Sequence, residues 1–189
     1  MSTAHVFPKP YADFVQRLRV PCGFLLLITF AWLSGPSRLS MFIGIPVSIL
    51  GLVLRGWASG HLAKDQQLAT SGPYSYIRNP LYAGTLIVAF GIVIASRNIW
   101  LGLIFAVAFS LIYLPAVELE EQHLNEIFPN YAAYANQIRR FLPVNHVSGS
   151  NRRFSWALYC RNEEYKATLG FLIALGWLFW RCWLRETVT

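Results

Sequence analysis

The sequence predicts an all-α integral membrane protein, folded as a bundle of five transmembrane helices. Hydrophobic residues make up 55% of the 189 residues and charged residues only 13%, whereas a soluble domain carries about 25% charged residues. The mean hydropathy is +0.41. Aromatic residues contribute 15% of the chain and include seven tryptophans. Such side chains anchor membrane proteins at the two lipid–water interfaces.

Five stretches are free of charged side chains for long enough to form membrane spans. They comprise residues 20–37, 39–54, 79–96, 98–117 and 167–180. A spanning helix needs about 20 apolar residues, so the second and fifth stretches must recruit flanking residues. The fifth reaches residue 184 if Arg181 extends its charge to the interface. Residues 37–39 join the first two stretches and residues 97–98 join the next two, which predicts two tight hairpins.

The distribution of basic residues predicts the orientation in the membrane. If the N-terminus lies in the cytoplasm, twelve of the sixteen Lys and Arg residues fall on the cytoplasmic side and four on the other. This split follows the positive-inside rule, and it places the polar segments 59–78 and 118–166 in the cytoplasm. The net charge is +7, but no run of Lys and Arg exceeds two residues. The charge therefore indicates membrane topology and not nucleic-acid binding.

The chain is expected to form a single membrane domain, residues 1–189. It comprises a helical hairpin (1–58), a core with long polar loops (59–143) and an interfacial segment with the fifth helix (144–189). Residues 151–166 mix aromatic and basic side chains, which is typical of an amphipathic segment at the membrane surface. An alternative is a lid that brings Arg161 or Glu163 near a substrate. The three widely spaced cysteines predict neither a disulfide framework nor a metal site.

Residues 72–84 form the first candidate for a binding site. Gly72-Pro73 is a turn signal, and Pro80 precedes a long apolar run, as expected at the first turn of a helix. Such a helix start presents unpaired backbone N–H groups that favour an anionic group such as a carboxylate. Arg78 lies just before it. The alternative is an ordinary helix start flanked by interfacial Tyr and Arg anchors.

Three glutamates at the cytoplasmic end of the fourth stretch form the second candidate. Glu118, Glu120 and Glu121 occupy a position where basic residues are usual. Their carboxylates would accept hydrogen bonds from a ribose diol or pair with an ammonium group. The alternative is a solvated acidic helix that has Lys64 or Arg78 as partners.

Together these segments resemble the superfamily of isoprenylcysteine carboxyl methyltransferases and phospholipid methyltransferases. The resemblance is carried by residues 68–74, 78–84, 120–121 and 141–143, in the same order as in the superfamily. It implies an integral membrane methyltransferase that uses S-adenosylmethionine, with cofactor-binding loops at the cytoplasmic face. Arg-Asn-Pro at residues 78–80 is similar to a bacterial form of the motif, which implies a bacterial inner membrane.

The resemblance also implies roles for individual residues. Those expected to bind the cofactor are His61, Gln66, Gln67, Leu68, Ala69, Tyr74, Asn79, Pro80, Leu81, Tyr82 and Glu120. His61 stands for an upstream position that Lys64 would equally fill. The residues expected to take part in catalysis are Arg78, Tyr82 and Glu121, and no metal ion is expected.

The sequence departs from the superfamily pattern at three positions. Asn79 and Gln66 stand where the carboxyl methyltransferases usually have His, and Ala116 stands where they have an Arg that contacts the substrate carboxylate. The cofactor site is thus expected to be retained and the prenylcysteine carboxylate site to be lost. We expect a lipophilic small-molecule acceptor that enters from the bilayer, with an isoprenylcysteine-like acceptor as the alternative.

Two other classes of function remain open at this stage. The superfamily's fold is similar to that of membrane sterol reductases, in which case Arg78 and Lys64 would bind the phosphates of NADPH. No glycine-rich phosphate loop is present in the sequence. The other class is a non-catalytic protein that binds lipid. Membrane lipids are expected partners in every case.

Overall fold

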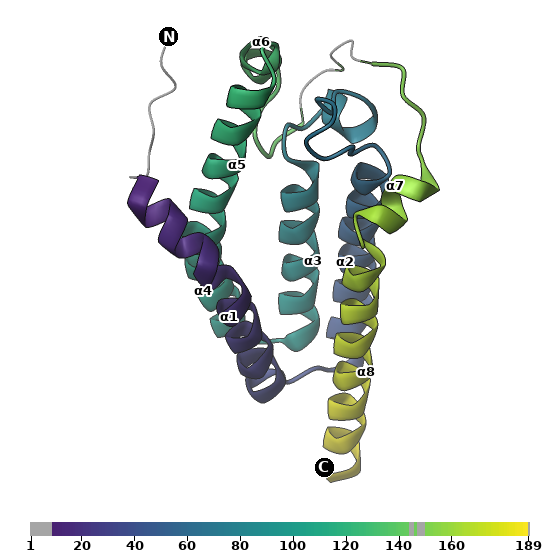
Figure 1. The fold of residues 1–189 in the computed structure, drawn as a ribbon. Coiled ribbons are helices and arrows are strands. Elements are labelled where there is room, and N and C mark those ends of the chain that lie inside the picture. Colours follow the sequence, from purple (N-terminus) through teal and green to yellow (C-terminus); the bar gives the residue numbers. More distant parts are fainter. Residues whose placement is uncertain (1–8, 144–145, 147–149, 189) are drawn as a thin grey trace.

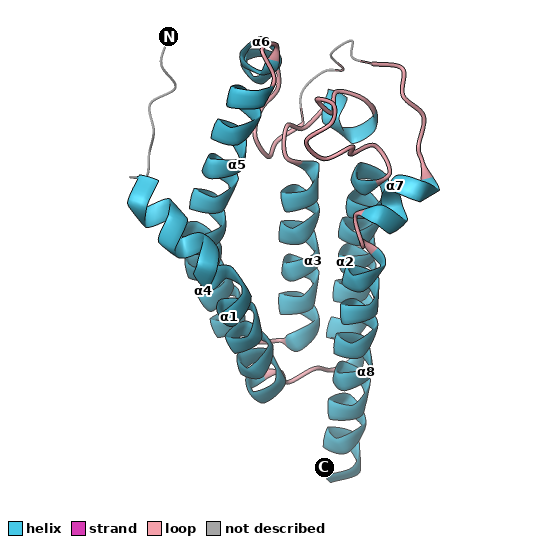
Figure 2. Ribbon diagram, in the orientation of Figure 1, coloured by secondary structure: helices cyan, strands magenta, loops and turns pink. Residues whose placement is uncertain are grey.

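The computed structural model describes residues 9–143, 146 and 150–188, and in this part of the chain all regular structure is helical (Figures 1 and 2). The ends of the predicted domain, residues 1–8 and 189, and residues 144–145 and 147–149 of its interfacial segment lie outside the described residues. The elements in chain order are α1 (Lys9–Leu33), α2 (Arg38–Ser59), the 3₁₀ turn η1 (Gly72–Ser75), α3 (Pro80–Ser96), α4 (Ile99–Ala108), the π-helical turn η2 (Phe109–Tyr113), α5 (Leu114–Ile127), α6 (Tyr131–Gln137), α7 (Trp156–Arg161) and α8 (Tyr165–Val188).

Among the described residues, three helices are long and apolar enough to cross a membrane by themselves. They are Arg38–Ser59, the continuous helix Ile99–Ile127 that joins α4, η2 and α5, and Tyr165–Thr187. The two stretches that looked short in the sequence are extended because α2 continues through Arg55 and α8 continues through Arg181. The apolar part of α1, Pro21–Leu33, and the helix α3, Pro80–Ser96, are shorter than a full span.

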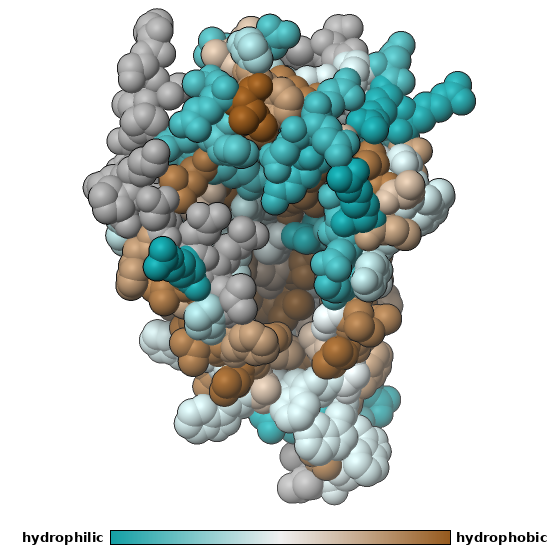
Figure 3. Space-filling view, in the orientation of Figure 1, coloured by the Kyte–Doolittle hydropathy of each residue, from teal (hydrophilic) through white to brown (hydrophobic). Residues whose placement is uncertain are grey.

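The surface has the polarity expected of an integral membrane protein. Figure 3 shows hydrophobic residues gathered around the middle of the molecule and hydrophilic residues at the end where α6 and the long loops lie. Large apolar side chains such as Phe42, Trp100 and Ile173 are 65% or more exposed. A lipid environment covers such side chains without cost.

The helices form two groups that diverge from one end of the molecule (Figure 1). In one group α2 packs against α3 and α8, and in the other α1 packs against α4, η2 and α5. At the narrow end, Gly35 N in the connection between α1 and α2 donates to the carbonyl of Ser96 in α3 (2.9 Å). Within the second group, Asn98 Nδ2 at the start of α4 donates to the carbonyl of Leu33 at the end of α1 (2.9 Å). Short turns separate α1 from α2 and α3 from α4, at the two places where the sequence predicts them. Helices α1 and α2 nevertheless lie in different groups and do not form a packed hairpin.

Close backbone contact between α2 and α3 builds the first group. A Cβ atom at Gly51 would lie 2.6 Å from Val88 N and 2.7 Å from the carbonyl oxygen of Gly84, so only glycine fits there. The Ser48 hydroxyl donates across the interface to the carbonyl of Val88 (3.0 Å). Between membrane helices, small residues and polar bonds of this kind replace the hydrophobic effect as the source of association.

The wide end of the molecule carries the polar loops. Helix α5 ends at Ile127 and α6 begins at Tyr131, with Pro129 between them. After α6 the chain returns to the start of α3, where Arg78 N and Asn79 N donate to the carbonyls of Arg139 (2.9 Å) and Arg140 (3.1 Å). These bonds fix the segment before α3 against the segment after α6.

A glycine substitution tests the α2–α3 interface. We expect Gly51→Ala to lower stability by about 1–3 kcal/mol, because the added methyl group overlaps backbone atoms that cannot move aside. Gly176 on α8 has no neighbouring atom within 4 Å of an added Cβ, so Gly176→Ala should be neutral or stabilising by up to about 1 kcal/mol through helix propensity. Thermal unfolding in detergent measures the stability of both variants. An equal change of stability in the two would contradict the close contact of α2 and α3 at Gly51.

Candidate functional site

A cavity of about 440 Å³ lies at the loop-bearing end, between the loop after α2, the start of α3, and helices α5 and α6. It gathers residues that are far apart in the sequence. Of the residues expected to form the site, the ones that line it are Gln67, Leu68, Ala69, Tyr74, Arg78, Asn79, Pro80, Leu81, Tyr82 and Glu120. Lys64, the alternative to His61, and Ala116 also line it.

Two of the expected cofactor ligands lie outside the lining of this cavity. His61 is buried, and its Nδ1 lies 2.9 Å from the hydroxyl of Ser71. Burial lowers the pKa of this imidazole, which keeps it neutral near pH 7. Gln66 faces Arg161, whose guanidinium lies 2.9 Å from the amide oxygen once the amide is oriented to accept. Both residues shape the loop that forms one wall.

The start of α3 forms the opposite wall. Asn79 occupies the position before the helix and Pro80 its first turn, as the sequence predicts. The first turn of any helix has backbone N–H groups without an acceptor inside the helix, and here Leu81 and Tyr82 bring that turn to the cavity. The Asn79 side chain points elsewhere, since its Nδ2 donates to Glu121 Oε1 (2.7 Å).

Glu121, expected to be catalytic, is the centre of a buried ion cluster behind this wall. Its carboxylate lies 3.0 Å from Arg78 Nε and 2.7 Å from Arg140 Nη2. Arg140 was not expected in the site, because the sequence shows it only as one of two adjacent basic residues. The cluster ties α5 to the segment before α3 and to the segment after α6, and Glu121 does not line the cavity.

The neighbouring Glu120 faces the other way. Its side chain is exposed, and its Oε2 accepts a hydrogen bond from the Tyr82 hydroxyl (3.0 Å). Both residues line the cavity. An acidic group therefore stands at the rim of the cavity, where an ammonium group or a hydroxyl of a bound molecule would find an acceptor.

Three buried tyrosines contribute to the cavity wall. Burial is the main cause that raises the pKa of Tyr74, Tyr131 and Tyr134, so all three keep their hydroxyl protons. Tyr134 donates to the carbonyl of Tyr74 (2.8 Å). The hydroxyl of Tyr131, which is 4% exposed, has no hydrogen-bond partner among the described residues. A buried hydroxyl in this state costs about 1–3 kcal/mol, so its position suits a polar group of a bound molecule.

The described residues contain no group of three or more His, Cys, Asp or Glu side chains that could hold a metal ion. What the cavity offers is a carboxylate at its rim, protonated tyrosine hydroxyls, and an apolar wall that includes Leu68, Leu119 and Phe128. Such a site is suited to an organic molecule that has both polar and apolar parts.

Comparison with protein families gives a match to the phospholipid methyltransferase family over residues 23–131. This region includes α2, α3, α5 and the loop between α2 and α3. It ends at the first residue of α6, so α7 and α8 lie beyond it.

Three curated proteins illustrate the relatives. The nickel-cobalt-cadmium resistance protein NccN of Alcaligenes xylosoxydans xylosoxydans is 30% identical over 151 residues, which cover 72% of this chain and 70% of that protein. Phosphatidylethanolamine N-methyltransferase B of Dictyostelium discoideum is 28% identical over 109 residues, which cover 50% of this chain and 54% of that protein. The protein-S-isoprenylcysteine O-methyltransferase of Schizosaccharomyces pombe is 25% identical over 142 residues, which cover 72% of this chain and 60% of that protein.

The matches span 51–70% of the lengths of the curated relatives. No solved structure matches the chain at a significant level.

Substitution of the two adjacent glutamates separates structural from surface roles. Glu121→Gln should lower stability by about 3–5 kcal/mol, because it leaves two guanidinium groups partly buried without a counter-ion. Glu120→Gln should change stability by less than about 0.5 kcal/mol, since Glu120 is exposed. Thermal unfolding of both variants in the same detergent measures the difference. If Glu121→Gln is as stable as Glu120→Gln, the ion cluster does not hold these segments together.

Proposed function

This chain belongs to the phospholipid methyltransferase family, and on that basis we propose that it transfers a methyl group from S-adenosylmethionine to a lipophilic small molecule. The observation that carries the proposal is the cavity at the start of α3. It combines a rim carboxylate, Glu120, with the unpaired buried hydroxyl of Tyr131.

The residues of the cavity fit S-adenosylmethionine. A volume of about 440 Å³ lies within the range of about 300–1,000 Å³ typical of small-molecule sites. The first turn of α3, at Leu81 and Tyr82, would hold the cofactor carboxylate, and Glu120 would accept from its ribose hydroxyls or its ammonium group. The Tyr131 hydroxyl would donate to a further polar atom, and Leu68 and Phe128 would pack against the adenine.

In the proposed reaction the protein contributes mainly alignment. S-adenosylmethionine, when bound, supplies a methyl group on a sulfonium that is already an activated leaving group. The chain's residues hold the reactants in line and keep water out, and such positioning is worth roughly 7–11 kcal/mol of the barrier. The Tyr82 hydroxyl donates a hydrogen bond to Glu120, and the Glu120 carboxylate would accept the proton of an acceptor that arrives protonated.

The acceptor that best fits this cavity lacks a carboxylate. Arg78 lines the cavity, but its guanidinium lies 3.0 Å from Glu121 and also donates to the carbonyl of Ala135 (3.1 Å). Ala116, which lines the cavity as well, provides no charge. An apolar acceptor would be held by burial at about 0.8 kcal/mol per CH₂ group. The same engagement of Arg78 weighs against the NADPH-dependent alternative, which needs this residue for phosphate.

The proposed setting is a bacterial inner membrane crossed five times, with the cavity facing the cytoplasm. Alongside the three long spans, α1 and α3 would complete the bundle, with residues at their ends covering the difference in length. The twelve-to-four distribution of basic residues supports this orientation. A lipophilic acceptor would then arrive from the bilayer, and the cofactor from the cytoplasm.

Calorimetry with S-adenosylhomocysteine, in detergent, tests the cofactor assignment. We expect the wild-type protein to bind, Glu120→Gln to weaken binding at least about tenfold through loss of a charged contact, and Tyr131→Phe to weaken it about two- to tenfold. Tyr76→Phe is the matched control, because Tyr76 is exposed and does not line the cavity. Absence of binding to the wild-type protein would refute the assignment of the cofactor.

A methyl-transfer assay with labelled cofactor tests the acceptor. One panel contains prenylcysteine analogues with a free carboxylate, and the other contains membrane-soluble amines, phenols, thiols and lipids. We expect transfer to a member of the second panel. Efficient methylation of a prenylcysteine carboxylate that is lost in Arg78→Ala would show that Arg78 leaves Glu121 to bind substrate, and the proposed acceptor class would be wrong.

A further inference from the structure

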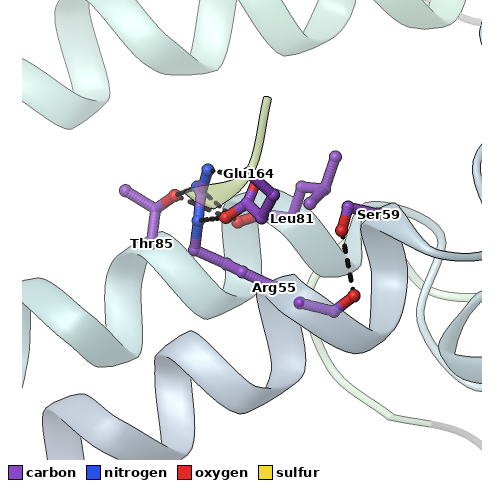
Figure 4. A network of polar contacts seen from close by, with 6 residues as sticks. Arg55, Ser59, Leu81, Thr85 and Glu164 are labelled. Atoms are coloured by element: carbon purple, nitrogen blue, oxygen red, sulfur yellow. Dashed lines mark hydrogen bonds and ion pairs between the residues drawn. The ribbon is translucent and has the colours of Figure 1, made fainter. Parts of the chain in front are cut away.

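A second buried ion pair lies behind the cavity and connects α8 to the start of α3 (Figure 4). Arg55 of α2 and Glu164, the residue before α8, form a two-pronged salt bridge with distances of 2.6 Å (Nε to Oε1) and 3.0 Å (Nη2 to Oε2). The remaining terminal nitrogen of Arg55 donates to the carbonyl of Leu81 (3.3 Å) and to the hydroxyl of Thr85. Leu81 itself lines the cavity.

The burial of this pair sets it apart from ordinary surface charges. The Glu164 side chain is 8% exposed, whereas the side chain of Glu163, which pairs with Lys166, is 57% exposed. Arg55 also passes directly over Gly84, where a Cβ atom would lie 2.5 Å from its Cγ. Ionisable groups within a membrane bundle are costly to bury and are typically retained for function.

The corner that leads from α7 into α8 makes further bonds to the wall of the cavity. Asn162 Nδ2 donates to the carbonyls of Ser59 and Leu62, both at 2.9 Å, and Ser155 N donates to the carbonyl of Gly60 (2.9 Å). Leu62 lines the cavity, and the loop that follows it supplies one wall. The corner therefore holds the C-terminal end of α2 and the first residue of that wall.

We propose that residues 155–164, the α7–α8 corner, position the cofactor site. Glu164 acts through Arg55 on the first turn of α3, and Asn162 acts through Leu62 on the loop at residues 62–69. The corner lies outside the region matched by the family model, which ends at residue 131. Because the corner positions a cofactor site, the proposal rests on the proposed function.

Two adjacent glutamates provide the test and its matched control. In full-length protein in detergent, Glu164→Gln should increase amide hydrogen exchange at residues 62–69 and at the first turn of α3, and should weaken S-adenosylhomocysteine binding about tenfold. Glu163→Gln should leave both unchanged. Glu164→Asp, which keeps the charge, should retain most of the wild-type affinity. If Glu164→Gln loosens only α8 and binds as tightly as the wild-type protein, the corner merely anchors α8 and the proposal is wrong.

A second variant covers the case in which Glu164→Gln fails to fold. Asn162→Ala leaves the ion pair intact, and it should increase exchange at residues 62–69 and weaken binding two- to tenfold; wild-type exchange and affinity in this variant would overturn the proposal. Hydrogen exchange is measured without ligand, so it tests the role of the corner independently of the cofactor assignment. A wild-type protein that binds no S-adenosylhomocysteine refutes the cofactor, whereas unchanged exchange at residues 62–69 refutes the role of the corner.

Discussion

The carboxylate of Glu121 is the interaction on which the loop-bearing end depends. It connects α5 to the segment before α3 through Arg78 and to the segment after α6 through Arg140, and its Oε1 also accepts from Asn79. Each of these segments comes from a different part of the chain. A carboxylate in such a place lowers the free energy of burying two guanidinium groups, and each guanidinium does the same for the carboxylate. The wall at the start of α3 has its position because this cluster fixes it.

The two helical groups are held together by different physical means. Within the first group, backbone contact at Gly51 and Gly84 leaves no space between α2 and α3, so dispersion and polar bonds stabilise the pair in lipid. Between the groups the connections described here are polar and lie at the two ends, at Gly35 in one case and at Glu121 in the other. The cavity forms at the wide end, where the groups diverge, and both groups contribute residues to its walls.

The sequence predicted the parts of the fold that depend on local physics. Pro80 before a long apolar run marked the start of α3, and residues 97–98 marked the turn between α3 and α4, because proline and turn residues act on their immediate neighbours. The charge-free stretches located the apolar helices but not their ends. Arg55 lies inside α2, directly after the second stretch, and pairs with Glu164, 109 residues later. Hydropathy contains no information about such a partner.

The site was predictable where a motif named it and unpredictable where its residues depend on distant contacts. Arg140 gave no separate signal, since its role arises from the return of the chain after α6. Two pairs of adjacent glutamates show the same limit of prediction from sequence. In Glu120-Glu121 and again in Glu163-Glu164, one carboxylate is exposed and its neighbour is buried in an ion pair with arginine. Successive helical residues point about 100° apart, and Glu163 has a positive φ of 54° that turns the chain before α8. Two identical residues in sequence thus face different environments, and the buried member of each pair determines where the walls of the cavity lie.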